Sequence, residues 1–256
     1  MIFQNLKINS IKLKNRIVVS PMCQYSSQNG SPSNWHYQHL EHLSSTGASM
    51  VLLESTAVDR LGKISDADMC LYNDTHEKNL KKLIKFLKSK NDIKYGIQIS
   101  HSGRKGSSYA PWIKHNTPLP KKKSWKTISA SSISRDKGWP KPTAMSKLQI
   151  KKVVQKFRNS AIRANRIKFD CLEIHMAHGY LLHQFFSPIS NKRIDEYGGS
   201  LLNRSRFLNE IAQEVRKVWP RHKILGARIT GTDHLKNGLS INDAIALSKD
   251  LKRIGF

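Results

Sequence analysis

The sequence predicts an α/β fold in which consecutive βα units form a parallel sheet. Two observations support this prediction. Five short apolar segments rich in β-branched residues alternate with five segments whose apolar residues recur at helical spacing. The length of 256 residues suits one large domain, and a parallel sheet that closes into a TIM (β/α)8 barrel needs roughly 250 residues.

The first half of the chain contains three of the expected strands and two of the expected helices. We expect the first helix at residues 34–45, with Gly47 as its C-terminal cap, and the second at residues 75–89. The strands of the whole chain are expected at residues 17–21, 49–55, 95–100, 169–175 and 224–229.

Three further helices follow in the second half of the chain. The third has apolar residues at helical spacing over residues 150–164, and the fourth has them over 208–218 and stops at Pro220. Ser240 is expected to cap the start of the fifth helix, which ends at Gly255.

The barrel is expected to be incomplete, because a closed barrel of this type has eight strands and the sequence contains five. Gly255 has the pattern of a helix cap, and Phe256 that of the first residue of a sixth strand. We therefore expect residues 1–256 to be the N-terminal part of a single barrel domain, with about five of the eight βα units. A long loop at residues 103–146 has the length of a lid or binding loop.

The formal charge of +26 raises the alternative of a basic nucleic-acid-binding protein. The densest basic patch is Lys121-Lys122-Lys123, with Trp125 and Lys126 nearby. Elsewhere the lysines alternate with apolar residues as on the solvent face of an amphipathic helix, and no nucleic-acid-binding motif is present. The distribution therefore makes nucleic acid an unlikely partner.

The sequence contains no signal for export, for a membrane or for a disulfide framework. No apolar run approaches the roughly 18 residues that span a bilayer, so we expect a soluble, cytoplasmic protein without a membrane partner. The three cysteines, Cys23, Cys70 and Cys171, are widely spaced and are expected to be reduced thiols.

Polar groups follow the carboxyl end of every predicted strand, where a barrel builds its active site. The most informative run is Ile174 to Tyr180, which places His175, His178 and Tyr180 just beyond an apolar strand. Two imidazoles and a phenol in this position suggest a site that binds and protonates an oxygenated substrate. The other groups follow at residues 20–25, 56–57, 98 with 101–104, and 228–233.

Several ordered motifs resemble the old yellow enzyme family, most closely its cysteine-bearing bacterial branch of ene-reductases and xenobiotic reductases. The resemblance covers essentially the whole chain, and its strength lies in the number, order and spacing of the motifs. They are Ser-Pro-Met-Cys-x-Tyr at 20–25, His-x-Gly-Arg at 101–104, Glu-Ile-His-x-Ala-His-Gly-Tyr-Leu at 173–181, and segments at 186–191, 195–200 and 203–207.

The resemblance implies an FMN-containing (β/α)8 barrel that takes hydride from NADPH or NADH and delivers it to an activated C=C bond of an enone. It leaves open whether the chain forms homo-oligomers, as members of the family often do. The last strands of the family's barrel, which bind the FMN phosphate, have no counterpart in this sequence. A catalytically inactive barrel remnant is therefore the alternative interpretation.

The resemblance also implies a set of cofactor-binding residues. The Cys23 thiol would lie near the flavin and tune its potential, although a buried Cys is otherwise a small hydrophobe. Gln98 can pair with the pyrimidine edge, or can be a polar residue that lines the barrel. Arg228 would place a cation beside N1 and the C2 carbonyl, or can be an exposed Arg at a strand end. The full set is Ser20, Pro21, Met22, Cys23, Ala57, Gln98 and Arg228.

On the substrate side, His175 and His178 resemble the pair that donates hydrogen bonds to the carbonyl oxygen of the substrate. Tyr180 would protonate the α-carbon, because a phenol with a pKa near roughly 10 remains protonated at neutral pH. Tyr25 is expected to line the same pocket.

A metal site is the competing interpretation of the fourth strand, since Cys171, Glu173 and His175 alternate onto one face with His178 nearby. Zinc sites usually use more regular ligand spacings, so we expect no metal. We interpret residues 195–206 as a structural loop and helix start held by ion pairs. Lys168 occupies a helix-cap position where the family has Gly, which should cost about 1 kcal/mol.

Overall fold

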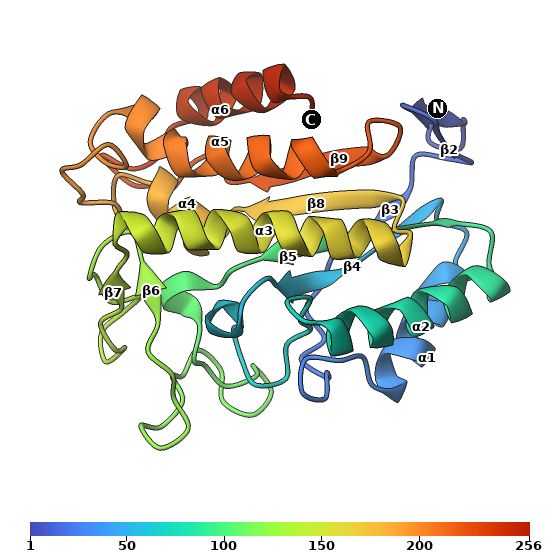
Figure 1. Ribbon diagram of the computed structural model, residues 1–256, viewed down its shortest axis with the longest axis horizontal. Coiled ribbons are helices and arrows are strands. Elements are labelled where there is room, and N and C mark those ends of the chain that lie inside the picture. The colour runs from blue at the N-terminus through green and yellow to red at the C-terminus, as the bar shows by residue number, and fades with distance from the viewer.

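A parallel sheet of five strands forms the centre of the protein, whose computed structural model describes residues 1–256 (Figure 1). Its spatial order is β3-β4-β5-β8-β9, and all neighbours are parallel. All five predicted strands are thus confirmed, with β3 shorter than expected. The strands are β3 (Val18–Val19), β4 (Met50–Ala57), β5 (Lys94–Ser100), β8 (Cys171–Met176) and β9 (Ile224–Ile229).

Helices cover the outer face of this sheet, and the five predicted helices are all present. In α6 the side chain of Ser240 accepts a hydrogen bond from the Asp243 N–H, and Gly255 ends the helix at φ +106°, as expected. Gly47 is not the cap of α1, because the helix ends at Ser45 in a right-handed conformation. The helices are α1 (Asn34–Ser44), α2 (Asp74–Lys90), α3 (Lys147–Ile167), α5 (Leu201–Val218) and α6 (Ile241–Ile254).

The sequence analysis did not anticipate several short elements. A hairpin of β1 (Leu6–Ile8) and β2 (Ile11–Leu13) precedes the sheet. Within the long loop, β6 (Ile128–Ser129) pairs with β7 (Thr143–Ala144). Directly after the site motif lies α4 (Leu181–Phe186), whose six residues are all buried. Because α4 has no solvent-exposed face, no amphipathic pattern revealed it. Two single 3₁₀ turns complete the set, η1 (Arg60–Gly62) and η2 (Gly103–Lys105).

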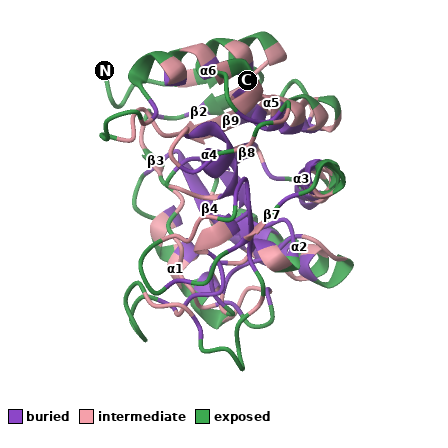
Figure 2. Ribbon diagram, turned by 90° about the vertical axis from the view of Figure 1, so that its left-hand side faces the viewer, coloured by how far each residue is buried: buried purple, intermediate pink, exposed green.

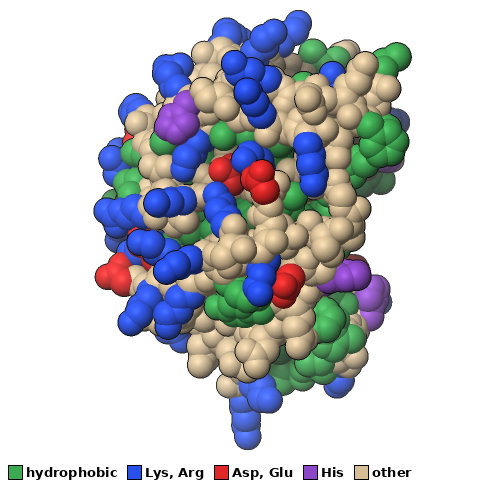
Figure 3. All heavy atoms as spheres, turned by 90° about the vertical axis from the view of Figure 1, so that its right-hand side faces the viewer, with side chains coloured by type: hydrophobic (Ala, Val, Ile, Leu, Met, Phe, Trp, Pro, Cys, Tyr) green, Lys and Arg blue, Asp and Glu red, His purple; other side chains and the backbone are tan.

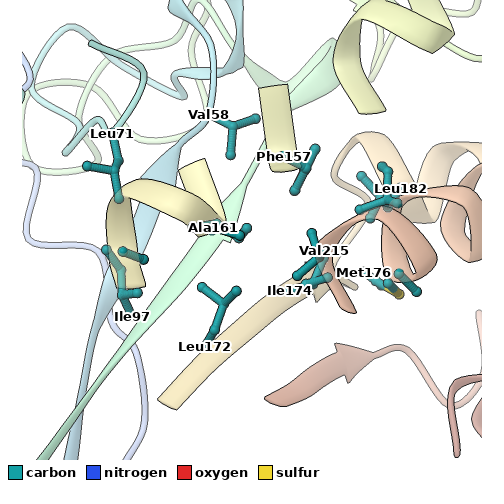
Figure 4. Packing of buried hydrophobic residues seen from close by; sticks show 14 of the residues in the cluster. Val58, Leu71, Ile97, Phe157, Ala161, Leu172, Ile174, Met176, Leu182 and Val215 are labelled. Atoms are coloured by element: carbon teal, nitrogen blue, oxygen red, sulfur yellow. The ribbon is translucent and has the colours of Figure 1, made fainter. Parts of the chain in front are cut away.

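Alternation along β8 divides its side chains between the core and the barrel interior. Leu172, Ile174 and Met176 point into the apolar layer between the sheet and α3 and α5 (Figure 4). The intervening residues, Glu173 and His175, therefore face the inside of the curled sheet. The core thus fixes which side chains the strand presents to the interior.

The sheet is curled into part of a (β/α)8 barrel, with β3 and β9 as its two edges. Figure 2 views the carboxyl ends of the strands, where buried α4 lies near the centre. The loops that follow the strands also gather at this end, which is the active face of such barrels (Figure 1).

Lys168, which ends α3, adopts the left-handed conformation expected of a glycine cap, with φ 72° and ψ 39°. The Lys88 ammonium donates to its carbonyl oxygen at 2.8 Å. The predicted structural loop beyond α4 is also confirmed, since Arg193 forms a bidentate ion pair with Asp195. The same guanidinium donates to the carbonyl oxygens of Ala130 and Met145.

Positive charge is spread over the surface. Figure 3, which views the amino-terminal end of the strands, shows Lys and Arg scattered across the face with few Asp and Glu between them. The buried side of α2 consists of residues such as Leu80, Leu83 and Leu87, and its lysines lie on the other side. None of the helices combines the length and the apolarity that crossing a bilayer requires.

Candidate functional site

His175, His178 and Tyr180, the three ring-bearing residues of the run from Ile174 to Tyr180, lie together at the carboxyl end of β8. The centre of the His175 ring lies 5.0 Å from that of His178 and 4.8 Å from that of Tyr180, with nearly perpendicular planes in both cases. The turn between them is left-handed at two consecutive residues, with φ 57° at His178 and 72° at Gly179. This turn brings the two imidazoles and the phenol around one space.

His175 is a neutral imidazole with a defined tautomer. Burial lowers its pKa to about 3, and the nearby positive charges of Arg228 and Lys105 act in the same direction. Its Nδ1 accepts a hydrogen bond from the Ala177 N–H at 3.2 Å, so the proton lies on Nε2. Nε2–H has no partner in the chain and can donate to a ligand oxygen.

Side chains from three other segments hold the backbone of this turn. The His178 N–H donates to Thr230 Oγ1 at 3.0 Å, and the His178 carbonyl oxygen accepts from Lys105 Nζ at 2.8 Å. The Gly179 carbonyl oxygen accepts from Gln184 Nε2 at 2.7 Å. Hydrogen bonds therefore stabilise the left-handed conformation on both sides.

His183 on α4 links this turn to the loop after β9. Its Nδ1 accepts from the Gly179 N–H at 2.8 Å, and its Nε2 lies 3.0 Å from Asp233 Oδ1. Because Nδ1 accepts, the ring carries its proton on Nε2, facing the carboxylate. His183 thus positions the turn without facing the space between the rings.

The Tyr180 phenol remains protonated far above neutral pH. Burial raises its pKa, and the neighbouring Cys23 and Asp68 raise it further. Lys105 lies over its ring, with Nζ 5.0 Å from the ring centre. Burial, together with Arg135 and Arg104, lowers the pKa of Lys105 to about 8.

The segment after β3 lies near the same space, since Tyr25 lines one pocket with Tyr180 and Cys23 is a neighbour of the Tyr180 phenol. Glu54, which lies at an irregularity of β4, accepts the Gln24 N–H on Oε2 at 2.9 Å, and its Oε1 lies 3.0 Å from His36 Nε2. The N–H groups of Met22 and Cys23 have no hydrogen-bond partner in the chain. Burial raises the pKa of the Cys23 thiol, which is therefore uncharged at neutral pH.

Tyr25 lies near Tyr180 in the structure. It lies in the left-handed region at φ 45°, and its ring packs edge-on against Trp112 with centres 5.4 Å apart. Burial raises its pKa, and the neighbouring Cys23 and Tyr180 raise it further. Tyr25 and Tyr180 line one pocket of about 390 Å³ together with residues of the long loop.

Gln98 and Arg228 meet through a residue that the sequence analysis did not assign to the cofactor. Gln98 Nε2 donates to Glu173 Oε1 at 2.6 Å, and Arg228 Nε donates to the same oxygen at 3.0 Å. These three side chains form a polar row across β5, β8 and β9 inside the curled sheet. Ala57 is buried at the carboxyl end of β4.

These residues fit the isoalloxazine ring of FMN. The free amides of Met22 and Cys23 are donors, and the polar row offers the unpaired Gln98 Oε1 as an acceptor and Arg228 Nη1 as a further donor. Flavin edges present carbonyl oxygens and an N–H that require such partners.

The residues of the alternative metal site have other partners in the structure. Cys171 packs in a small apolar cluster with residues such as Leu13 and Ile224, while Glu173 binds Gln98 and Arg228. No three His, Cys, Asp or Glu side chains are grouped so as to hold a metal ion.

Sequence reasoning missed three residues that contribute to the site: Lys105, Glu173 and His183. Lys105 directly follows the His-x-Gly-Arg motif, and the other two lie inside or next to the His motif, so each was close to an available signal. Their partners come from distant segments, and the sequence pattern does not encode these contacts.

Known proteins resemble this chain over nearly its whole length. Residues 1–255 match the model of the NADH:flavin oxidoreductase / NADH oxidase family. The NADPH dehydrogenase of Bacillus cytotoxicus is 40% identical over 256 residues, which cover 99% of this chain and 69% of that protein. The NADPH dehydrogenase of Bacillus subtilis is 38% identical over 260 residues and is covered to 70% of its length.

The fold is also similar to solved structures. Morphinone reductase in complex with tetrahydroNAD superposes with a TM-score of 0.85 at 23% identity, covering 100% of this chain and 71% of that one. This likeness confirms the expected barrel architecture.

Proposed function

Because this chain belongs to the NADH:flavin oxidoreductase / NADH oxidase family, we propose that it reduces the activated C=C bond of α,β-unsaturated carbonyl compounds. The chain is an NAD(P)H:flavin oxidoreductase with FMN as its cofactor. The names of its relatives favour NADPH as the reductant. The enone as electron acceptor, and the residues that bind and protonate it, go beyond the activity that the family shows.

FMN, when bound, supplies the hydride that it has taken from NAD(P)H. We assign its binding to the free amides on one side of the site and to the polar row on the other. Cys23 is placed to contact the ring as an uncharged thiol, and Arg228 to contact its pyrimidine end as a cation. The remaining residues of the set are Ser20, Pro21, Met22, Ala57 and Gln98.

His175 and His178 bind the carbonyl oxygen of the substrate. The Nε2–H of His175 is free to donate, and its ring remains neutral, so it polarises the carbonyl as a hydrogen-bond donor and not as an acid. The polarised carbonyl draws electrons from the β-carbon, which accepts the hydride.

Tyr180 completes the reduction by transferring its phenolic proton to the α-carbon. The π electron pair of the alkene thus becomes the C–H bond at the α-carbon, while the hydride forms the bond at the β-carbon. The Lys105 ammonium over the ring stabilises the phenolate left behind. The observation that carries the proposal is the grouping of two neutral imidazoles and a protonated phenol around one space at the carboxyl end of β8.

The test follows the flavin and the product separately. Under anaerobic conditions, NADPH should bleach the absorbance of the FMN-loaded chain, and 2-cyclohexenone should restore it. In D₂O with unlabelled NADPH, the saturated ketone should carry deuterium at the α-carbon and hydrogen from NADPH at the β-carbon. If oxygen restores the absorbance but the enone does not, the chain is a flavin oxidoreductase and the enone proposal is wrong.

A further inference from the structure

The pocket beside Tyr180 is lined by cationic, neutral polar and a few apolar residues, and no Asp or Glu is among them. It extends from Tyr25 and Tyr180 to the long loop, where Tyr109, His115 and Arg135 close it. Lys105 lines the side next to the His178 turn. A ligand in this pocket beside Tyr180 therefore lies near two cationic side chains, Lys105 and Arg135.

The cations of this region lack acidic partners. Arg104 Nη1 donates to the carbonyl oxygens of Ile133 and Ser134, and Lys105 Nζ donates to that of His178. The Arg135 guanidinium stacks on Trp139, with its carbon 4.4 Å from the ring centre. None of the three cations forms an ion pair.

Two carboxylates lie nearby but form no ion pair with these cations, although the Asp136 charge opposes the lowering of the Arg135 pKa by burial. Asp68 is buried and accepts the N–H groups of Ile64 and Ser65. Asp136 is exposed, and its Oδ1 accepts the Lys137 N–H at 2.7 Å. Neither side chain lines the pocket.

Half-buried like charges without a counter-ion are unfavourable, because desolvation and mutual repulsion both disfavour the charged forms. Burial lowers the pKa of both Lys105 and Arg135. An anion in the pocket would relieve both costs. Charge-assisted hydrogen bonds to such an anion are stronger than neutral ones.

We propose that Arg135 and Lys105 form an anion subsite, which binds a carboxylate or phosphate group of the ligand whose reacting part lies at Tyr180. This inference rests on the proposed function and deepens it by naming a ligand class. The anion has two sources, a carboxylate on the substrate or the phosphates of the dinucleotide. Both present the same oxyanion chemistry to the guanidinium.

Benzoate and its neutral isostere benzamide test the subsite directly, by calorimetric titration of the FMN-loaded chain. We expect benzoate to bind about tenfold more tightly than benzamide. Arg135→Gln should abolish this preference, and Arg135→Lys should retain most of it. Lys137→Gln is the matched control, because it removes the same charge from an exposed position two residues away and should leave the preference unchanged.

Equal affinities in the wild type, or an unchanged preference in Arg135→Gln, would overturn the proposal. The binding readout does not depend on turnover, and reduction of neutral 2-cyclohexenone reports separately on the proposed function. The two anion sources are distinguished kinetically. Arg135→Gln raises KM about tenfold for NADPH if the dinucleotide phosphates bind there, and for a carboxylated enone if the substrate does. A change in neither KM would contradict the subsite.

Discussion

The turn after β8 and the segment after β3 face the same space but are built in opposite ways. Around His178 and Gly179, both N–H groups and both carbonyl oxygens have partners. In the segment after β3, the N–H groups of Met22 and Cys23 have none. The first region orients side chains and needs a rigid backbone. The second leaves backbone donors free, which is the pattern expected where a cofactor supplies the partner.

The largest expected effect comes from the rigid turn. Tyr180→Phe removes the proton donor without removing the ring, so enone-dependent reoxidation of the reduced flavin should slow by about 10²- to 10⁴-fold. Reduction of the flavin by NADPH should be unchanged, because no proton from Tyr180 is needed. Stopped-flow absorbance measures both half-reactions. Equal slowing of the two would assign Tyr180 to cofactor binding.

A fall in pH should change the free energy of unfolding in opposite directions through the two regions. The pKa of His175 is about 3 in the folded chain, below its ordinary 6.5, so stability is lost as pH falls below 6.5. Burial raises the pKa of Asp68, beside the β3 segment, from 3.8 to about 7, so stability is gained as pH falls from 7 to 3.8. Each contributes about 1.4 kcal/mol per pH unit, and the two contributions oppose each other.

Asp68→Asn removes the compensating contribution. Between pH 6.5 and 4, its free energy of unfolding should therefore fall more steeply with acid than that of the wild type, by about 1.4 kcal/mol per pH unit. Urea unfolding at several pH values measures the slope. An identical slope in the two proteins would show that the carboxyl of Asp68 does not titrate in this range.

Loosening the rigid turn should have an intermediate effect. His183→Leu leaves the Gly179 N–H without its acceptor and separates the turn from Asp233, at a cost of about 1–3 kcal/mol. We expect a lower kcat for the enone with little change in FMN affinity. His222→Leu, at an exposed position, is the control. A loss of FMN affinity without a change in kcat would show that His183 does not position the turn.

The corresponding change in the other region is Glu54→Gln, which weakens the buried acceptor of the Gln24 N–H. The substitution should lower the free energy of unfolding by about 1–3 kcal/mol, because the pair with His36 is weakened too. In this variant the affinity for FMN should fall. The ratio between the rate of flavin reoxidation by the enone and the rate of flavin reduction by NADPH should remain constant. Fluorescence titration with FMN checks this, and unchanged affinity would show that Glu54 does not support the cofactor segment.

The smallest expected effect measures the free-energy cost of a left-handed backbone conformation at Lys168, outside the site. Lys168→Gly should stabilise the chain by about 1 kcal/mol, because Lys168 has φ 72° and glycine adopts this conformation without strain. Thermal unfolding measures the gain. His178 has a similar φ of 57° but is held by hydrogen bonds, so His178→Gly should not give a comparable gain.

The sequence predicted the regular part of this fold well, and the reason is visible in β8 and α3. Both bury a periodic apolar face in one core, so each leaves a pattern along the chain. By contrast, α4 is buried on every side and too short for periodicity, and β6 and β7 contain two residues each. Such elements depend on tertiary contacts.

For the site, the sequence identified the residues that carry rings but not those that hold them. His175, His178 and Tyr180 lie within one run, so their proximity follows from chain connectivity. Glu173 was expected to be a metal-ligand alternative at most, and its role between Gln98 and Arg228 depends on three strands lying side by side. Arg135 reaches Tyr180 only because the long loop folds back over it.

The hydrogen bonds from Arg193 to Ala130 and Met145 have a consequence for the segment that carries Arg135. Ala130 and Met145 flank residues 131–144, the segment that carries Arg135. The Arg193 guanidinium therefore binds the backbone at both ends of this segment. Arg104 holds the same segment through the carbonyl oxygens of Ile133 and Ser134. The place of Arg135 beside Tyr180 therefore depends on two arginines that lie outside its own segment.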